Sequence, residues 1–175
     1  MASDPKSPGA LFDAHCAAEF ETRDIDATMA TMSDCPYLTN VPTMTGGYGR
    51  EAVRRFYATW FVGHLPEDWS VTLLSRTEGS DQVVDEVIIS FTHDCPMQCF
   101  LPGVPPTGRK VTIPLVVVAG VKDGQITHEH IYWDQASLLV QIGLLDQTKL
   151  PVTGAEQAAR LLDPKLPSNT LIPNA

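Results

Sequence analysis

The sequence has few basic residues, no long apolar segment and no regular cysteine spacing. Its 175 residues include 12 Lys and Arg against 21 Asp and Glu, a formal net charge of −9. A chain without a basic stripe lacks the charge pattern that binds nucleic acid or anionic membranes, so we expect neither as a partner. No apolar run approaches membrane-spanning length and no early segment resembles a secretory leader, which together indicate a cytoplasmic protein.

The four cysteines match no zinc-binding or redox spacing, because Cys95 and Cys99 are separated by three residues rather than two. We interpret all four as reduced structural thiols, and we expect no metal and no cofactor. With 43% hydrophobic and 19% charged residues, the chain has the composition of a globular protein. Its length fits one domain with a sizeable core.

Helical patterns come first along the chain and strand patterns follow. Apolar residues recur at helical spacing in residues 10–22, 24–32 and 50–61. A short strand is predicted at residues 37–41 and a loop at 42–49. Alternating patterns then predict long antiparallel strands at 69–76, 82–93 and 109–121, with a fourth beginning near residue 125 after a tight Asp-Gly turn. Short helices are expected at 136–142 and 155–162.

Segregated helices and strands predict an α+β fold, in which a curled antiparallel sheet packs against the N-terminal helices. A hollow between the two layers is a favourable place for a pocket. We divide the chain into a loose N-terminal arm (1–9), the α+β domain (10–148) and a Pro-rich C-terminal extension (149–175). The extension is expected to pack on the domain or on a partner subunit.

The fourth long strand carries the residues best suited to chemistry. Strict alternation places Ile126, His128, His130, Tyr132 and Asp134 on one face. Imidazole, phenol and carboxylate groups transfer protons near neutral pH, so we predict that this face lines the pocket. The opposite face carries three further residues and is predicted to bury a homodimer interface: Glu129, Ile131 and Trp133.

Asp134 is the predicted catalytic acid/base, assisted by His130 or by His93 at the end of another apolar strand face. Asp134 also precedes a helix, where aspartate is a favoured N-cap, and both roles stay open. The predicted substrate-binding residues share a position on a strand, helix or loop that could face the hollow: Tyr132, His128, Tyr57, Trp60, Tyr48, Asn40 and Phe91. Met97, Phe100 and Leu101 could form an apolar lid.

Four short motifs, in this order and spacing, resemble SnoaL-like proteins of the nuclear transport factor two-like superfamily. They are Gly49-Arg50-Glu51-Ala52-Val53, Pro106-Thr107-Gly108-Arg109, Asp123-Gly124-Gln125-Ile126 and Trp133-Asp134 before Gln-Ile-Gly-Leu-Leu. The resemblance covers roughly residues 12–145. It implies a cone-shaped α+β barrel, usually a homodimer, with a pocket between sheet and helices.

The founding members resemble polyketide cyclases that need no metal or cofactor, and relatives include epoxide hydrolases and ketosteroid isomerases. In the cyclases the aspartate that Asp134 matches is the general acid/base. We therefore predict a cofactor-free acid/base enzyme of cyclase or isomerase type, acting on a small apolar carbonyl compound such as a polyketide or lactone. The alternatives are a metal-dependent hydrolase built on His128, His130 and His93, and a non-catalytic dimeric module that binds a small molecule.

Overall fold

A computed structural model describes residues 7–173, so most of the predicted N-terminal arm lies outside the described residues. The chain begins with α1 (Pro8–Cys16), which continues as the π-helical turn η1 (Ala17–Glu21), and then α2 (Ile25–Ala30). Ser7 caps α1, and the Asp24 carboxylate caps α2 by accepting from two backbone amides. These helices confirm the helical spacing of the first thirty residues.

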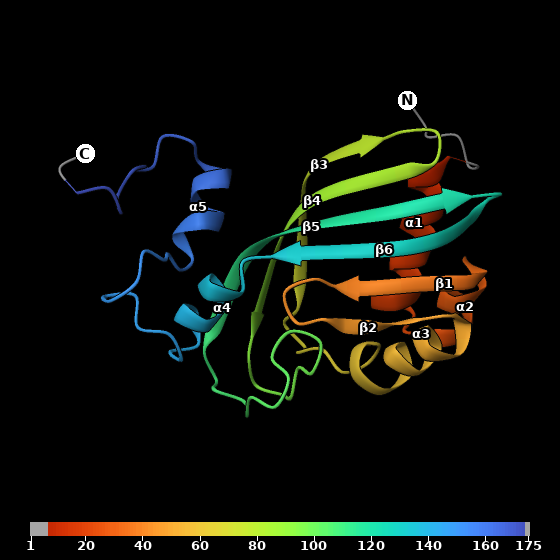
Figure 1. Ribbon diagram of the computed structural model, residues 1–175, viewed down its shortest axis with the longest axis horizontal. Helices are drawn as coiled ribbons and strands as arrows, with labels where there is room; N and C mark the ends of the chain where they lie inside the picture. Colours follow the sequence, from red (N-terminus) through yellow and green to blue (C-terminus); the bar gives the residue numbers. More distant parts are fainter. Residues whose placement is uncertain (1–6, 174–175) are drawn as a thin grey trace.

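Six strands form one curled, unclosed sheet in the order β2-β1-β6-β5-β4-β3 (Figure 1). The strands β3 (Ser70–Glu78), β4 (Gln82–Thr92), β5 (Lys110–Lys122) and β6 (Gln125–Trp133) form the predicted antiparallel meander. The first strand, β1 (Met32–Asn40), adds to β6 in parallel, which the sequence did not predict. The α+β class with a curled sheet and N-terminal helices is confirmed.

The strand β2 (Thr45–Tyr48) lies where the sequence predicted a loop, and it forms a hairpin with β1. The prediction was wrong because glycines signal turns, whereas Gly46 is used here for close approach. Its φ is +135°, and a Cβ there would collide with the carbonyl of Leu38 on the paired strand.

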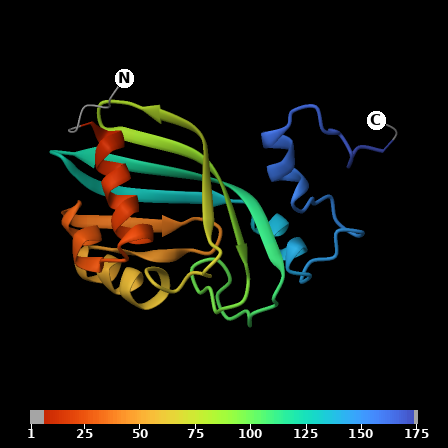
Figure 2. The same ribbon diagram turned by 180° about the vertical axis from the view of Figure 1, so that it is seen from behind.

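The helix α3 (Arg50–Phe56) and the π-helical turn η2 (Tyr57–Phe61) follow β2. Figure 2 shows α1 crossing one face of the sheet, with α2 and α3 along the edge formed by β1 and β2. Because the sheet curls toward these helices, its concave face and the helices enclose the core. The residues buried between the two layers include Phe12, Met29, Val53, Phe56 and Ile89.

A β-bulge in β6 decides which side chains reach this core. Gly120 of β5 pairs with His128 and Val121 pairs with Ile126, so Thr127 has no partner in the ladder. One extra residue reverses the alternation of side chains beyond it. Ile126 and Glu129 are therefore both buried on the inner face, while the ring of His128 lies over Gly120 on the outer face.

The C-terminal helices α4 (Gln135–Gln141) and α5 (Glu156–Leu162) follow beyond the end of β6 (Figure 1). Ser137 of α4 donates a hydrogen bond of 2.8 Å to the carbonyl of Gly154, and Gln157 of α5 donates one of 2.6 Å to Asp134. These bonds attach the segment after residue 149 to the start of α4. Among residues 7–173, no helix is long and apolar enough to cross a membrane.

Candidate functional site

A cavity of about 120 Å³ lies between the concave face of the sheet and the N-terminal helices. Engineered cavities of about 150 Å³ hold one benzene ring, so the space suits a small molecule. Most of the wall is apolar, and its aromatic members come from the helices, the residue before β3 and the loop before β5: Phe12, Phe20, Phe56, Tyr57, Phe61, Trp69 and Phe100.

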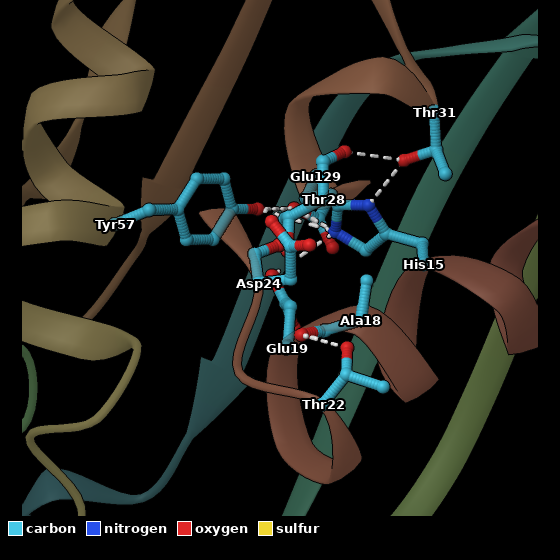
Figure 3. A network of polar contacts seen from close by, with 9 residues as sticks. All are labelled: His15, Ala18, Glu19, Thr22, Asp24, Thr28, Thr31, Tyr57 and Glu129. Carbon is cyan, nitrogen blue, oxygen red and sulfur yellow. Dashed lines mark hydrogen bonds and ion pairs between the residues drawn. The ribbon is translucent and has the colours of Figure 1, made fainter. Parts of the chain in front are cut away.

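Four buried polar groups meet at one end of this cavity, namely His15, Glu19, Tyr57 and Glu129 (Figure 3). The Tyr57 hydroxyl donates a 2.5 Å hydrogen bond to Glu129 Oε2. His15 Nε2 lies 3.0 Å from Glu19 Oε1, 3.5 Å from Glu129 Oε2 and 3.3 Å from the Tyr57 hydroxyl. One imidazole therefore faces two carboxyl groups inside an apolar enclosure.

Each member of the group is placed by a different element. His15 and Glu19 are four residues apart on the continuous helix formed by α1 and η1, so they share a face. Tyr57 opens η2 across the core. Glu129 enters from β6, between Leu38 of β1 and Ala119 of β5.

Thr31 fixes the orientation of the His15 ring. The Thr31 hydroxyl donates a 2.7 Å hydrogen bond to the carbonyl of Thr28, so its oxygen accepts from His15 Nδ1 at 2.6 Å. A proton on Nδ1 leaves Nε2 to face the carboxyl groups (Figure 3).

Burial and the neighbouring charges set the ionisation of these groups. Burial raises the pKa of Glu19, and the attraction of His15 offsets this only in part. Burial also opposes ionisation of Glu129, but the charge of His15 and the hydrogen bonds from His15 and Tyr57 outweigh it and hold that pKa below its usual value. The pKa values of the two carboxyl groups are thus shifted in opposite directions, which makes Glu129 the better base and Glu19 the better acid.

Burial lowers the pKa of His15, yet Glu19 and Glu129 together raise it well above its usual value. Burial, followed by the charges of the same two carboxyl groups, raises the pKa of Tyr57 well above its usual value. His15 is therefore held as an imidazolium and Tyr57 as a neutral hydrogen-bond donor.

Asp85 is a third buried carboxylate of the cavity wall, with both oxygens bound by Arg76. Arg76 Nε lies 2.6 Å from Oδ1 and a terminal nitrogen 2.7 Å from Oδ2. The same guanidinium contacts Asp13 of α1 at 2.8 Å, so it ties the helix to the sheet beside the cavity.

The prediction that the His128, His130 and Tyr132 face lines the pocket is wrong. Beyond the bulge these side chains lie on the outer face of the sheet, where Tyr132 is 44% exposed. The rings of His128 and His130 are 4.8 Å apart, and Tyr37 stacks on His128 at 4.9 Å.

The predicted dimer surface is wrong for the same reason. Glu129 and Ile131 line the cavity and Trp133 is buried in the core, so these three residues do not form an outer surface.

Asp134 is exposed and caps α4, with Oδ1 accepting from the amides of Ala136 and Ser137 and Oδ2 from Gln157. His93 is fully buried but lies outside the cavity wall, bound through Nδ1 to the Thr107 hydroxyl at 3.2 Å. Neither residue meets the group around Glu129.

The predicted substrate-binding residues divide between the cavity and other parts of the molecule. Tyr57, Asn40 and, from the predicted lid, Phe100 line the cavity. Tyr48 is 76% exposed and Trp60 39% exposed, both away from the wall, and the rest lie in the packed core: Phe91, Met97 and Leu101.

Sequence reasoning missed His15, Glu19 and the inward position of Glu129. A usable signal was present, because His15 and Glu19 lie four residues apart on a helix and Glu129 alternates with the apolar Ile131 and Trp133. The more apolar face of a half-buried strand faces the core, which would have selected Glu129.

Within residues 7–173, the grouping of potential metal ligands found is His15, Glu19 and Glu129, whose ligand atoms lie within 4.8 Å of one another. The predicted set of His128, His130 and His93 is not brought together, because the first two lie on the outer face and His93 is buried beside Thr107. His15 and Tyr57 already donate hydrogen bonds to the two buried carboxyl groups. We therefore interpret the group around Glu129 as a proton-transfer site.

The curled sheet, its covering helices and the enclosed cavity define a protein of the nuclear transport factor two-like fold. More narrowly, residues 12–129 match the SnoaL-like domain, and the chain belongs to this family. A search of curated protein sequences finds no significant match.

Solved structures give the same fold. A SnoaL-like polyketide cyclase structure from Jannaschia sp. CCS1 aligns with a TM-score of 0.64 and 20% identity over 83% of this chain and 99% of that one. TsrD from Streptomyces laurentii aligns with a TM-score of 0.63 and 22% identity over 82% of this chain and 99% of that one. A protein with a ketosteroid isomerase-like fold from Catenulispora acidiphila, in complex with trimethylamine, aligns with a TM-score of 0.58 and 19% identity over 79% of this chain and 95% of that one.

Proposed function

We propose that this protein is a cofactor-free acid/base enzyme of the isomerase or cyclase type, acting on a small apolar carbonyl compound. The observation that carries the proposal is the pairing of Glu129, whose pKa is lowered, with Glu19, whose pKa is raised, in one apolar cavity. Two carboxyl groups whose pKa values differ in this way can serve as base and acid in one reaction.

In the proposed reaction, Glu129 removes a proton from the carbon beside the substrate carbonyl. Glu129 Oε2 accepts from Tyr57, which leaves Oε1 as the oxygen that takes the proton. When Glu129 becomes protonated it needs the Tyr57 bond less, so Tyr57 can donate to the developing enolate oxygen.

Glu19 then returns a proton to the substrate at a second position. In an isomerase, the carbon that takes this proton determines the new position of the double bond. In a cyclase, the carbon nucleophile instead closes a ring. The His15 imidazolium gives its Nε2 proton to Glu19. It then takes the proton from Glu129 once that carboxyl group turns Oε1 toward Nε2, which restores the starting state. The apolar wall excludes water that would compete for these protons.

Exchange of carbon-bound hydrogen tests this proposal without knowledge of the natural substrate. A panel of small ketones and lactones, including 4,4-dimethylcyclohexanone, is incubated in D₂O, and loss of the α-proton signals is followed by NMR. We expect enzyme-dependent exchange that is lost in Glu129→Gln, whose amide keeps the shape but cannot act as a base. Binding without exchange across the panel would instead support the non-catalytic module.

The homodimer also belongs to the proposal, on a different surface from the one first expected. The outer face of β1, β2 and β6 carries a contiguous set of rings formed by Tyr37, Tyr48, His128 and His130. Tyr48 is exposed and the other three are half-buried, and a partly exposed aromatic cluster of this kind favours burial against a partner. Light scattering after size exclusion tests this, and a mass near 19.1 kDa would contradict it.

A further inference from the structure

A second hollow lies beside the cavity, between η1 and the start of β3. The two hollows share four residues, Cys16, Phe20, Trp69 and Val71, so they adjoin each other, and the outer one is taken as the mouth of the inner one. The rings of Phe20 and Trp69 are nearly parallel, with centroids 6.3 Å apart. A ligand must therefore pass or rest beside these two aromatic rings.

Carboxyl groups line both parts of the ligand's path, the mouth and the cavity. Asp13 and Glu21 line the mouth, while Glu19, Asp85 and Glu129 line the cavity. Among the described residues that line either hollow, none is Lys, Arg or His. With Glu19 protonated as the acid, the other four carboxylates face two cations behind the wall, Arg76 and His15.

The excess of negative charge therefore lies toward the mouth and beside Asp85. Arg76 is shared between Asp13 and Asp85, and Glu21 adds a further charge at the mouth, whereas the charge of His15 matches that of Glu129. A path lined by one sign of charge with apolar walls concentrates ligands of the opposite sign. Aromatic faces such as those of Phe20 and Trp69 attract organic cations in particular.

From this arrangement we infer that the natural ligand is a small organic cation, a carbonyl compound that also bears an amine or quaternary ammonium group. Its cationic end lies at the mouth beside Phe20, Trp69 and Glu21, and its carbonyl end lies at Glu129 and Tyr57. This inference rests on the proposed function in taking this cavity as the substrate site and in giving the ligand a carbonyl group, whereas the cationic group is argued from the path alone. It defines the substrate class, which the acid/base chemistry alone leaves open.

A pair of probes with the same shape and different charge tests the inference directly. Choline carries a trimethylammonium group, and 3,3-dimethyl-1-butanol replaces it with a neutral tert-butyl group. Calorimetry on the full chain is expected to show choline binding roughly ten-fold or more tighter than the alcohol. Added NaCl should weaken choline binding and leave the alcohol unchanged.

Two variants locate the effect. Glu21→Gln removes one charge from the mouth and should reduce the preference for choline, whereas Glu51→Gln removes an exposed charge of α3 that lines neither hollow and should leave it unchanged. Equal affinity for the two probes, a preference for the alcohol, or no binding of either would overturn the inference.

If Glu21→Gln prefers choline over the alcohol as strongly as the wild type does, the placement of the cation at the mouth is overturned. These outcomes are read from binding alone, so they are distinct from the hydrogen-exchange result. Exchange without a preference for choline would leave the proposed function standing, and a preference for choline without exchange would leave the cation site standing.

Discussion

Both faces of β6 carry titratable residues, but in very different surroundings. On the outer face His128 and His130 stack with Tyr37 at the surface of the sheet. On the inner face Glu129 is 4% exposed and bonded to Tyr57 and His15 in the core. The comparison teaches that enclosure matters more than residue type for acid/base chemistry. Burial and close partners shift the pKa values of Glu129 and Glu19, whereas the imidazoles on the outer face lie outside the cavity.

The largest effect is expected from removing the inner imidazole. His15→Leu leaves two buried carboxyl groups without their cation, and loss of one partner of a buried ion pair costs about 3–5 kcal/mol in the free energy of unfolding. The matched control, His130→Leu on the outer face, breaks no buried ion pair and should cost about 1 kcal/mol or less. Urea denaturation measures both, and equal losses would remove the distinction between the faces.

The inner histidine should also give stability a particular pH dependence. Its pKa in the folded protein is raised above the unfolded value of about 6.5, so its contribution is fully present below that pH. The contribution is lost as pH rises through the folded pKa. The stability difference between wild type and His15→Leu should therefore shrink on the alkaline side, and a difference that does not vary with pH would contradict the assignment.

An intermediate effect is expected at Tyr57. Tyr57→Phe leaves the buried Glu129 carboxylate short of a donor, which should cost about 1–3 kcal/mol of stability. The pKa of Glu129 should rise, so the acidic limb of any activity profile should move to higher pH. Tyr37→Phe on the outer face is the control, and its profile should match that of the wild type.

The smallest effect is expected at the end of β6. Asp134 caps α4, so Asp134→Ala should cost about 1 kcal/mol, while Asp134→Asn keeps a capping oxygen and should cost little. Thermal unfolding separates the two variants. A large loss of stability in Asp134→Asn would show a role beyond the cap.

Most of the fold could be predicted from the sequence, because the periods of the apolar residues differ clearly between helices and strands. The helix from Arg50 and the strands β3 to β6 show such periods over many residues. The parallel pairing of β1 with β6 could not be predicted, since no local pattern distinguishes a partner far along the chain. The short β2 was missed because its glycines resemble a turn.

The site was assigned to the wrong face because of one residue. Strict alternation from Ile126 predicts His128 inside, but the bulge at Thr127 reverses the order. No residue in this stretch is a glycine or proline that would mark the bulge. The resemblance to cyclases also drew attention to Asp134, whose place after β6 is that of a helix cap.

A comparison of two amide substitutions tests the account most directly. Glu129→Gln on the inner face and Asp134→Asn on the cap each replace one carboxylate by an amide of the same shape, and both are measured by α-proton exchange on an active ketone. We predict that Glu129→Gln reduces the rate by about 10²–10⁴-fold while Asp134→Asn stays within about two-fold of the wild type. The reverse result, with Asp134→Asn inactive and Glu129→Gln unchanged, would contradict the assignment of the chemistry to the inner face.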